Sequence, residues 1–234
     1  PWGLSFLRML DMANDSALFR TEPGPGLVPL YEGKMLHQFD HRYGSYEARG
    51  NERGFTRLPE TPLERYRDPT HTVQPFYWVM ERQGNERLHG KWSRPWLIAF
   101  RDVTNTTNER TAIFSFLPRV GVGHKAPLVL LAVADAALSA CLLANANSLV
   151  FDYVARQKIG GTSLGYFLLK QLPTIPPGAY TPDEVAFVAA RVLELVYTAR
   201  DMQPFACDMG CDGPPFVWDE ERRADLRALL DAVH

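Results

Sequence analysis

The stretch Asn145-Ala-Asn-Ser-Leu-Val-Phe-Asp-Tyr-Val-Ala-Arg-Gln-Lys-Ile-Gly-Gly-Thr-Ser-Leu-Gly-Tyr-Phe-Leu-Leu-Lys-Gln-Leu-Pro-Thr-Ile-Pro-Pro177 marks a change of architecture along this chain. Its order of residue types predicts a helix over 147–156, a loop at Gly160-Gly161, a strand over 163–169 and a proline-rich turn. The cations Arg156 and Lys158 stand beside glycines, where the backbone can approach a ligand closely. We therefore expect this stretch to join a sheet to a helical region and to present donors at the junction.

The chain before this stretch is rich in predicted strands. The three runs 75–80, 96–103 and 111–117 combine aromatic or β-branched residues with flanking turn residues, and they predict one mixed or antiparallel sheet, with 127–133 as a further core strand. The run 134–144 then predicts a helix, and 46–72 a long polar loop with several arginines. The predicted strands are 27–31, 75–80, 96–103, 111–117 and 127–133.

The chain after this stretch is predicted to be helical. Thr181-Pro-Asp-Glu184 has the form of a capping box with proline at the first helical position, and apolar residues then follow at helical spacing up to Val196. Asp219 opens a last helix, for which we expect Leu226, Leu229, Leu230 and Val233 to face inward. The prediction is an α+β fold with a sheet lobe at 1–178 and a helical scaffold at 179–234, together forming one compact unit. The unfinished apolar stripe at His234 and the first residue, Pro1, lead us to expect a fragment of a longer protein.

Composition limits the class of protein. The chain has 234 residues, of which 46% are hydrophobic, enough for a sizeable core. Cys141, Cys207 and Cys211 are too few for a disulfide framework, so we expect a cytoplasmic protein. The apolar run 126–144 has nearly the length of a membrane span, but Asp135 interrupts its middle, and we expect protein interior and no membrane.

Charge is distributed unevenly along the chain. The net charge is −2, yet 91–170 carries nine Lys/Arg against four Asp/Glu, and 180–234 carries five against eleven. A locally basic face can attract phosphates whatever the net charge, so nucleic-acid binding stays possible. Ordinary solvated surfaces would give the same counts, and charge alone does not decide between the two.

Motifs for catalysis or for a resident cofactor are missing from the sequence. Gly121-Val-Gly123 lacks the third glycine of a phosphate-binding loop, and His37 and His41 lack a third metal ligand nearby. Cys207 and Cys211 have only Asp208 and Asp212 beside them, a weak set for zinc. We expect no catalytic residue, no cofactor and no metal in this chain.

A binding function remains, and it would use donors suited to phosphates or base edges. Several of these donors fall at turns beside predicted strands, although each one alone is as well explained as an ordinary surface residue. The candidate DNA-binding residues are Lys34, His37, Gln38, Arg42, Lys125, Arg156, Lys158, Thr162 and Lys170.

Four segments in this order resemble the C-terminal region of large bacterial DNA methylases of restriction-modification type, which has a TaqI-like specificity domain. The resemblance covers nearly the whole chain. The segments are Pro29-Leu-Tyr-Glu-Gly-Lys-Met-Leu-His-Gln-Phe-Asp-His-Arg42, Asn147-Ser-Leu-Val-Phe-Asp-Tyr-Val-Ala-Arg-Gln-Lys-Ile-Gly-Gly-Thr162, Leu172-Pro-Thr-Ile-Pro-Pro177 and Pro215-Phe-Val-Trp-Asp-Glu-Glu-Arg-Arg-Ala224.

The resemblance implies a domain that recognises a short sequence in double-stranded DNA. A methylase module of the same polypeptide would transfer the methyl group from S-adenosylmethionine to adenine. This chain lacks the Asn/Asp-Pro-Pro-aromatic catalytic motif, since Gly213-Pro-Pro-Phe216 has glycine at the position that needs an amide or carboxylate. The alternative is a protein-interaction domain that docks a partner through its C-terminal helices.

Overall fold

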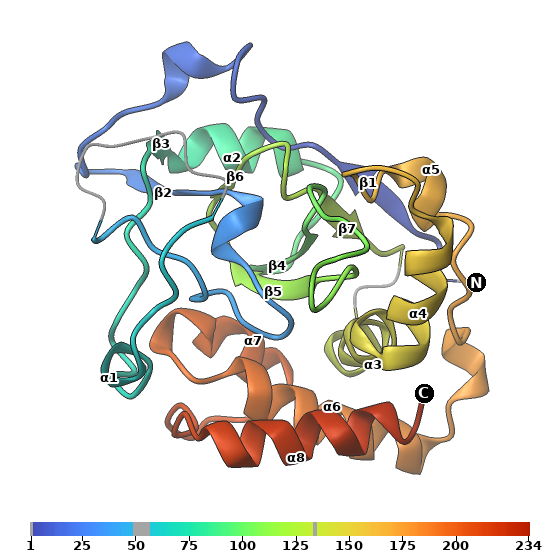
Figure 1. Cartoon of the computed structure of the whole chain (residues 1–234). Coiled ribbons are helices and arrows are strands. Elements are labelled where there is room, and N and C mark those ends of the chain that lie inside the picture. Colours follow the sequence, from blue (N-terminus) through green and yellow to red (C-terminus); the bar gives the residue numbers. More distant parts are fainter. Residues whose placement is uncertain (1, 49–56, 133–134) are drawn as a thin grey trace.

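The computed structural model describes residues 2–48, 57–132 and 135–234. Strands predominate in the N-terminal half and helices in the C-terminal half, so the predicted α+β fold is confirmed (Figure 1). Two sheets form in place of the single predicted one. Buried side chains from both predicted regions, 1–178 and 179–234, join in one hydrophobic core.

The larger sheet has four antiparallel strands. Its order is β1 (Ser5–Leu7), β7 (Leu128–Leu130), β4 (Trp96–Phe100) and β5 (Phe114–Pro118). All five residues of β4 are buried, which explains a continuous apolar sequence without alternation. Since β5 lies at the edge of this sheet, its outer backbone groups need other partners.

The smaller sheet has the order β3 (Trp78–Met80), β2 (Leu27–Tyr31), β6 (Gly121–Val122). Strand β2 is antiparallel to β3 and parallel to β6. A Cβ at Gly121 would lie 2.4 Å from Cγ1 of Val79, so only glycine permits this approach. A strand of two residues, such as β6, has no periodicity that could be detected in the sequence.

Two consecutive helices follow the larger sheet. Asp135 accepts a hydrogen bond from the Leu138 N–H at 2.8 Å and so caps α3 (Ala136–Asn147) instead of interrupting an apolar run. Ser148 caps α4 (Leu149–Lys158) in the same way. No single helix of the described residues is long and apolar enough to cross a membrane, and α3 and α4 reach that length only as a pair bent by 56°.

The C-terminal helices form a layer beneath the sheets (Figure 1). The predicted capping box of Thr181 and Glu184 is confirmed at the start of α6 (Pro182–Val196). Asp219 caps α8 (Glu220–Asp231), and α7 (Gln203–Asp208) lies between the two helices in sequence. The prediction for Leu229 is wrong, since this side chain is 40% exposed while Leu226 and Leu230 are buried.

Short elements complete the fold and correct two further expectations. The run 163–169, expected to be a strand, contains α5 (Tyr166–Leu169), because an apolar run this short fits either structure. The polar α2 (Glu81–Leu88) was not predicted. The remaining elements are α1 (Leu63–Tyr66) and the 3-10 helices η1 (Ser16–Leu18), η2 (Gly33–Met35), η3 (Pro177–Ala179) and η4 (Arg200–Met202).

Candidate nucleic-acid interface

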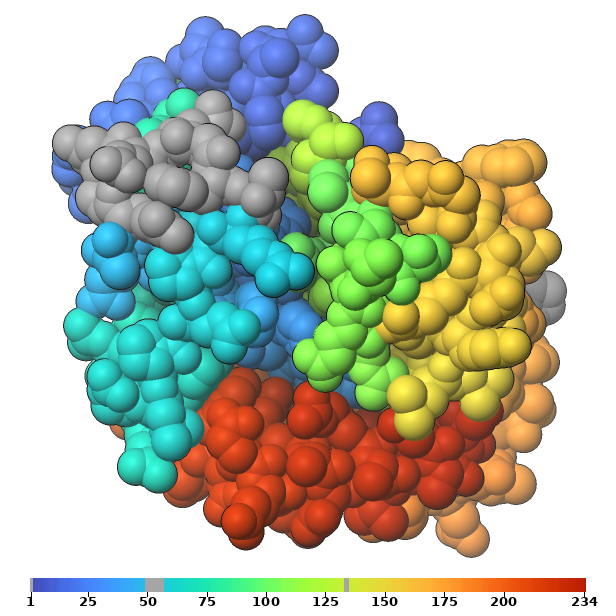
Figure 2. All heavy atoms as spheres, in the orientation of Figure 1, coloured from blue at the N-terminus to red at the C-terminus, as the bar shows by residue number. Residues whose placement is uncertain are grey.

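A polar groove crosses one face of the molecule. Two adjoining hollows of about 220 and 300 Å³ share His37, Tyr43, Glu60 and Glu109 as lining residues. Figure 2 shows the 57–66 segment (cyan) and the 104–111 loop (green) on either side, the 37–43 segment (blue) between them and the C-terminal region (red) below. We call this the arginine groove, after Arg57, Arg101, Arg110, Arg223 and Arg227 in its lining.

The floor of the groove is a tight turn held by backbone and side-chain bonds. The His37 N–H donates to the Asp40 carbonyl at 2.8 Å, and the Asp40 N–H donates back at 3.0 Å. Phe39 takes a positive φ of 59° inside this turn, and its N–H donates to the Phe114 carbonyl of β5. The Asp40 carboxylate accepts the Tyr66 hydroxyl at 2.6 Å. The turn therefore fixes the position of His37 at the groove surface.

His37 lies at the centre of the groove. Its ring packs on Tyr43 with centroids 4.6 Å apart. Burial is the largest cause that lowers the pKa of His37, and Arg101 and Arg227 add to it, against Asp40 and Glu109. The imidazole is therefore neutral at pH 7, with one donor and one acceptor nitrogen.

The cations of the groove outnumber its anions. The lining holds six basic and four acidic side chains, counting Lys34 with the arginines and Asp40, Glu60, Glu109 and Glu220 as the acids. Three of the acids accept local hydrogen bonds: Asp40 from Tyr66, Glu60 from Tyr43 and Glu220 from Trp218. These three acids are thus occupied within the protein, and the four acids together neutralise the six cations only in part.

The arginines of the groove are mostly without partners. The guanidinium groups of Arg57, Arg101, Arg110 and Arg227 make no hydrogen bond or ion pair with any residue that the structure describes. Burial lowers the pKa of Arg101, and Nη1 of Arg110 is buried without an acceptor. Arg223 differs, because it stacks on Trp218 at 3.6 Å and donates to the Leu195 carbonyl. An anion placed here would meet guanidinium groups whose donors are unused.

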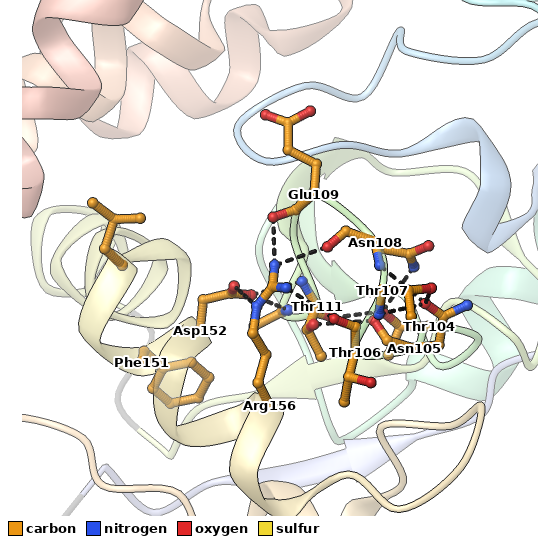
Figure 3. A network of polar contacts seen from close by, with 12 residues as sticks. Thr104, Asn105, Thr106, Thr107, Asn108, Glu109, Thr111, Phe151, Asp152 and Arg156 are labelled. Atoms are coloured by element: carbon orange, nitrogen blue, oxygen red, sulfur yellow. Dashed lines mark hydrogen bonds and ion pairs between the residues drawn. The ribbon is translucent and has the colours of Figure 1, made fainter.

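The 104–111 loop forms one wall of the groove and is fixed to α4 by two side chains (Figure 3). One Asp152 oxygen accepts the N–H groups of Thr111 and Ala112, both at 2.7 Å, and the other accepts Nε of Arg156 at 2.8 Å. The Arg156 guanidinium donates to the carbonyls of residues 106, 108 and 109. This aspartate–arginine pair therefore holds the loop backbone from both ends.

The loop is also bonded within itself. The Asn105 side chain accepts from the Thr107 N–H at 2.9 Å and from the Asn108 N–H at 3.0 Å. The Thr104 hydroxyl donates to the Thr111 carbonyl at 2.8 Å, closing the base of the loop. Polar side chains that look solvent-facing in the sequence are thus used to fix its shape.

Asn147 completes the edge of the larger sheet. Its side-chain oxygen accepts the Phe114 N–H at 2.9 Å, and its side-chain nitrogen donates to the Phe114 carbonyl at 3.0 Å. The amide thereby takes the place of a neighbouring strand on β5. Together with the Ser148 cap, this contact gives the Asn-Ser pair of the opening stretch a structural role.

Two predicted DNA contacts are wrong because the structure buries them. Arg42 is 0% exposed, and its guanidinium donates to backbone carbonyls from Tyr66, Asp68 and Thr198. Gln38 is 3% exposed and donates to the carbonyls of Ala112 and Asn147. Neither side chain can reach DNA without unfolding its surroundings.

The other predicted contacts are spread over several places. Lys34 and His37 line the groove, and Lys34 also lies 3.5 Å from Glu32. Lys125 pairs with Asp102 at 3.2 Å, beside the loop that holds Thr162. Lys158 and Lys170 are exposed just at or after the ends of α4 and α5, and Arg156 belongs to the loop clamp.

The sequence interpretation missed most of the groove. Arg101 and Arg110 flank the loop that joins β4 to β5, and Arg227 comes from α8, more than a hundred residues later. Pairing the predicted strands 96–103 and 111–117 as a hairpin would have placed Arg101 near Arg110. No local signal could have added Arg227.

No protein-family model, curated protein or solved structure matches this chain.

Proposed function

We propose that this chain is a DNA target-recognition domain that binds double-stranded DNA along the arginine groove. The single observation that carries the proposal is the set of four unpartnered arginines, of which Arg110 has a buried nitrogen without an acceptor. Unused guanidinium donors match phosphate oxygens and guanine edges. The resemblance of the sequence to specificity domains of adenine DNA methylases favours DNA over other polyanions.

In this proposal the chain binds and does not catalyse. A separate methylase module of the same polypeptide would supply S-adenosylmethionine and transfer the methyl group, beside a base turned out of the duplex. The groove offers His37 and Glu109 as well as cations, so it presents acceptors beside donors. Both kinds of group are needed to distinguish base edges, whereas cations alone position the backbone.

Salt dependence of duplex binding tests the proposal. Phosphate contacts by the three arginines Arg57, Arg101 and Arg227 predict a slope of about −2.7 for the logarithm of the binding constant against the logarithm of salt concentration. We expect fluorescence anisotropy with a random duplex to give such a slope for the 234-residue chain. Arg227→Gln should reduce it by about one unit.

A matched control separates the groove from general charge. Arg82 is an exposed arginine on α2 that does not line the groove, so Arg82→Gln should leave the slope unchanged. Absence of duplex binding at low salt would refute the proposal. An equal loss in Arg82→Gln and Arg227→Gln would show that binding is not located in the groove.

Protein docking is the second candidate function, and one observation favours it. Leu149, Val150 and Tyr153 of α4 are 55%, 56% and 66% exposed. The Leu149 N–H donates to Asp231 at 2.8 Å, so the end of α8 adjoins these side chains. If the arginine groove and the exposed side chains of α4 act separately, Tyr153→Ser should leave DNA binding unchanged. Titration of the wild type and of the variant with the same duplex would show this.

A further inference from the structure

We propose that the 104–111 loop is the base-reading element of the groove, and that Glu109 and Arg110 recognise a G·C base pair. This inference rests on the proposed function, since it assigns a role within the same DNA site. It starts from a different observation, namely how the loop backbone is fixed and which of its side chains remain without partners.

The backbone of the loop is immobilised by α4. The Arg156 guanidinium donates to three backbone carbonyls of the loop, and the Asp152 carboxylate accepts the two N–H groups at the end of the loop. The Asp152 side chain is 5% exposed, so water competes little for these bonds. DNA binding to a fixed loop costs little conformational entropy, and the fixed backbone keeps the base-contacting side chains in place.

Glu109 and Arg110 differ from the other side chains of the loop. Asn105, Asn108, Thr104 and Thr111 use their polar atoms inside the loop. The carboxylate of Glu109 makes no hydrogen bond or ion pair within the described parts of the chain, and its residue lines both hollows of the groove. The loop therefore combines a rigid backbone with two ionic groups that are not used for folding.

These two groups are complementary to one base pair. An arginine donates two hydrogen bonds to O6 and N7 of guanine, and a glutamate accepts from N4 of cytosine. Arg110 lines the groove and supplies the donors, and its Nη1 has no acceptor among the described residues. Thr106 and Thr107, at the tip of the loop, are exposed, and the Thr107 hydroxyl donates to the Asn105 side chain at 2.7 Å.

Arg156 is a positioning residue in this scheme. Its guanidinium is bound to Asp152 and to loop carbonyls, and its side chain is only 27% exposed, so it holds the loop instead of contacting DNA. A lysine at this position would keep the charge but would lose the planar fork that reaches several acceptors at once. Arg156→Lys should therefore misplace Glu109 and Arg110 together.

Selection from a randomised duplex library, followed by sequencing, tests the inference with the 234-residue chain. The wild type should enrich a site that contains a G·C pair. Arg110→Ala should reduce discrimination at that pair about 5- to 150-fold, and Glu109→Gln should reduce it at the same or the adjacent pair. Arg156→Lys should weaken discrimination at all positions read by the loop while the salt slope stays within one unit of wild type.

Two substitutions outside the groove serve as matched controls. Glu86→Gln and Arg82→Ala change exposed charges on α2, outside the groove, and should leave the selected site unchanged. Arg110→Lys serves as a second variant where Arg110→Ala fails to fold. An unchanged site in the Glu109 and Arg110 variants, with duplex binding intact, would overturn this inference alone. No duplex binding by the wild type would overturn the proposed function as well.

Discussion

Replacing Arg156 by alanine should destabilise the protein, and the structure allows the size of the effect to be worked out. The substitution removes the bond to Asp152 at 2.8 Å and the bonds to the carbonyls of Thr106 and Asn108 at 3.0 and 2.9 Å. It leaves the Asp152 carboxylate, 5% exposed, with two backbone N–H partners and no counter-charge. From the sequence alone, by contrast, Arg156 is one of the candidate DNA-binding residues.

The magnitude follows from the number of bonds and their exposure. Breaking a buried ion pair by removing one partner costs about 3 to 5 kcal/mol. The Arg156 side chain is 27% exposed, so water replaces part of what the loop carbonyls lose, and we expect a loss of about 2 to 3 kcal/mol. For a chain of this length each kcal/mol corresponds to about 2 to 4 °C in Tm.

Urea denaturation followed by circular dichroism measures this loss. Lys158→Ala is the matched control, because Lys158 lies two residues away, is exposed and bonds to no residue in the described part of the chain. The control should stay within about 0.5 kcal/mol of wild type. Equal stabilities of the two variants would refute the loop clamp. A double-mutant cycle with Asp152→Asn should give a coupling of about 0.5 to 3 kcal/mol.

Four further substitutions have expected outcomes. Arg101→Met should raise the free energy of unfolding by about 1 kcal/mol in urea titrations while weakening duplex binding, because it removes a half-buried charge without a partner. Asn147→Ala should cost about 1 to 3 kcal/mol by the same measurement, since the buried N–H of Phe114 loses its acceptor. Thr181→Ala should lower Tm through loss of the α6 cap, worth about 1 kcal/mol. The pKa of His37 is lowered in the native state, so this state binds fewer protons than the unfolded state. The free energy of unfolding should therefore fall as the pH drops below 6.5 towards the native pKa. His37→Gln should reduce this fall, as denaturation curves taken on either side of pH 6.5 would show.

The predictable parts of the fold were those with local chemistry. Thr181 and Glu184 predict the start of α6, because a capping box is contained within four residues. Strand β4 and helix α3 were found because apolar runs of their length have few alternatives. Two predictions were wrong because no such local signal exists. They concerned the short α5 and the separation of the strands into two sheets, which depends on long-range pairings such as β2 with β6.

The candidate site was less predictable than the fold, and the reason lies in how arginine is used. Arg42 and Arg110 look alike in sequence, since both stand in polar segments beside predicted strands. Arg42 is fully buried and bonded to carbonyls of the 66–71 segment and of Thr198, whereas Arg110 lines the groove and keeps a nitrogen without an acceptor. Only the tertiary structure decides which arginine is satisfied by the protein itself.

This distinction also changes the meaning of the stretch 145–177. Four of its polar residues, Asn147, Ser148, Asp152 and Arg156, are bonded within the protein and stabilise the edge strand and the loop. The arginines without partners come from other segments, and Arg101 opposes stability because its guanidinium is half-buried near Arg57. Stability and DNA binding should therefore respond in opposite directions to substitution at Arg101, and in the same direction at Arg156. A series in which both substitutions moved the two properties together would show that the groove arginines serve the fold, not a ligand.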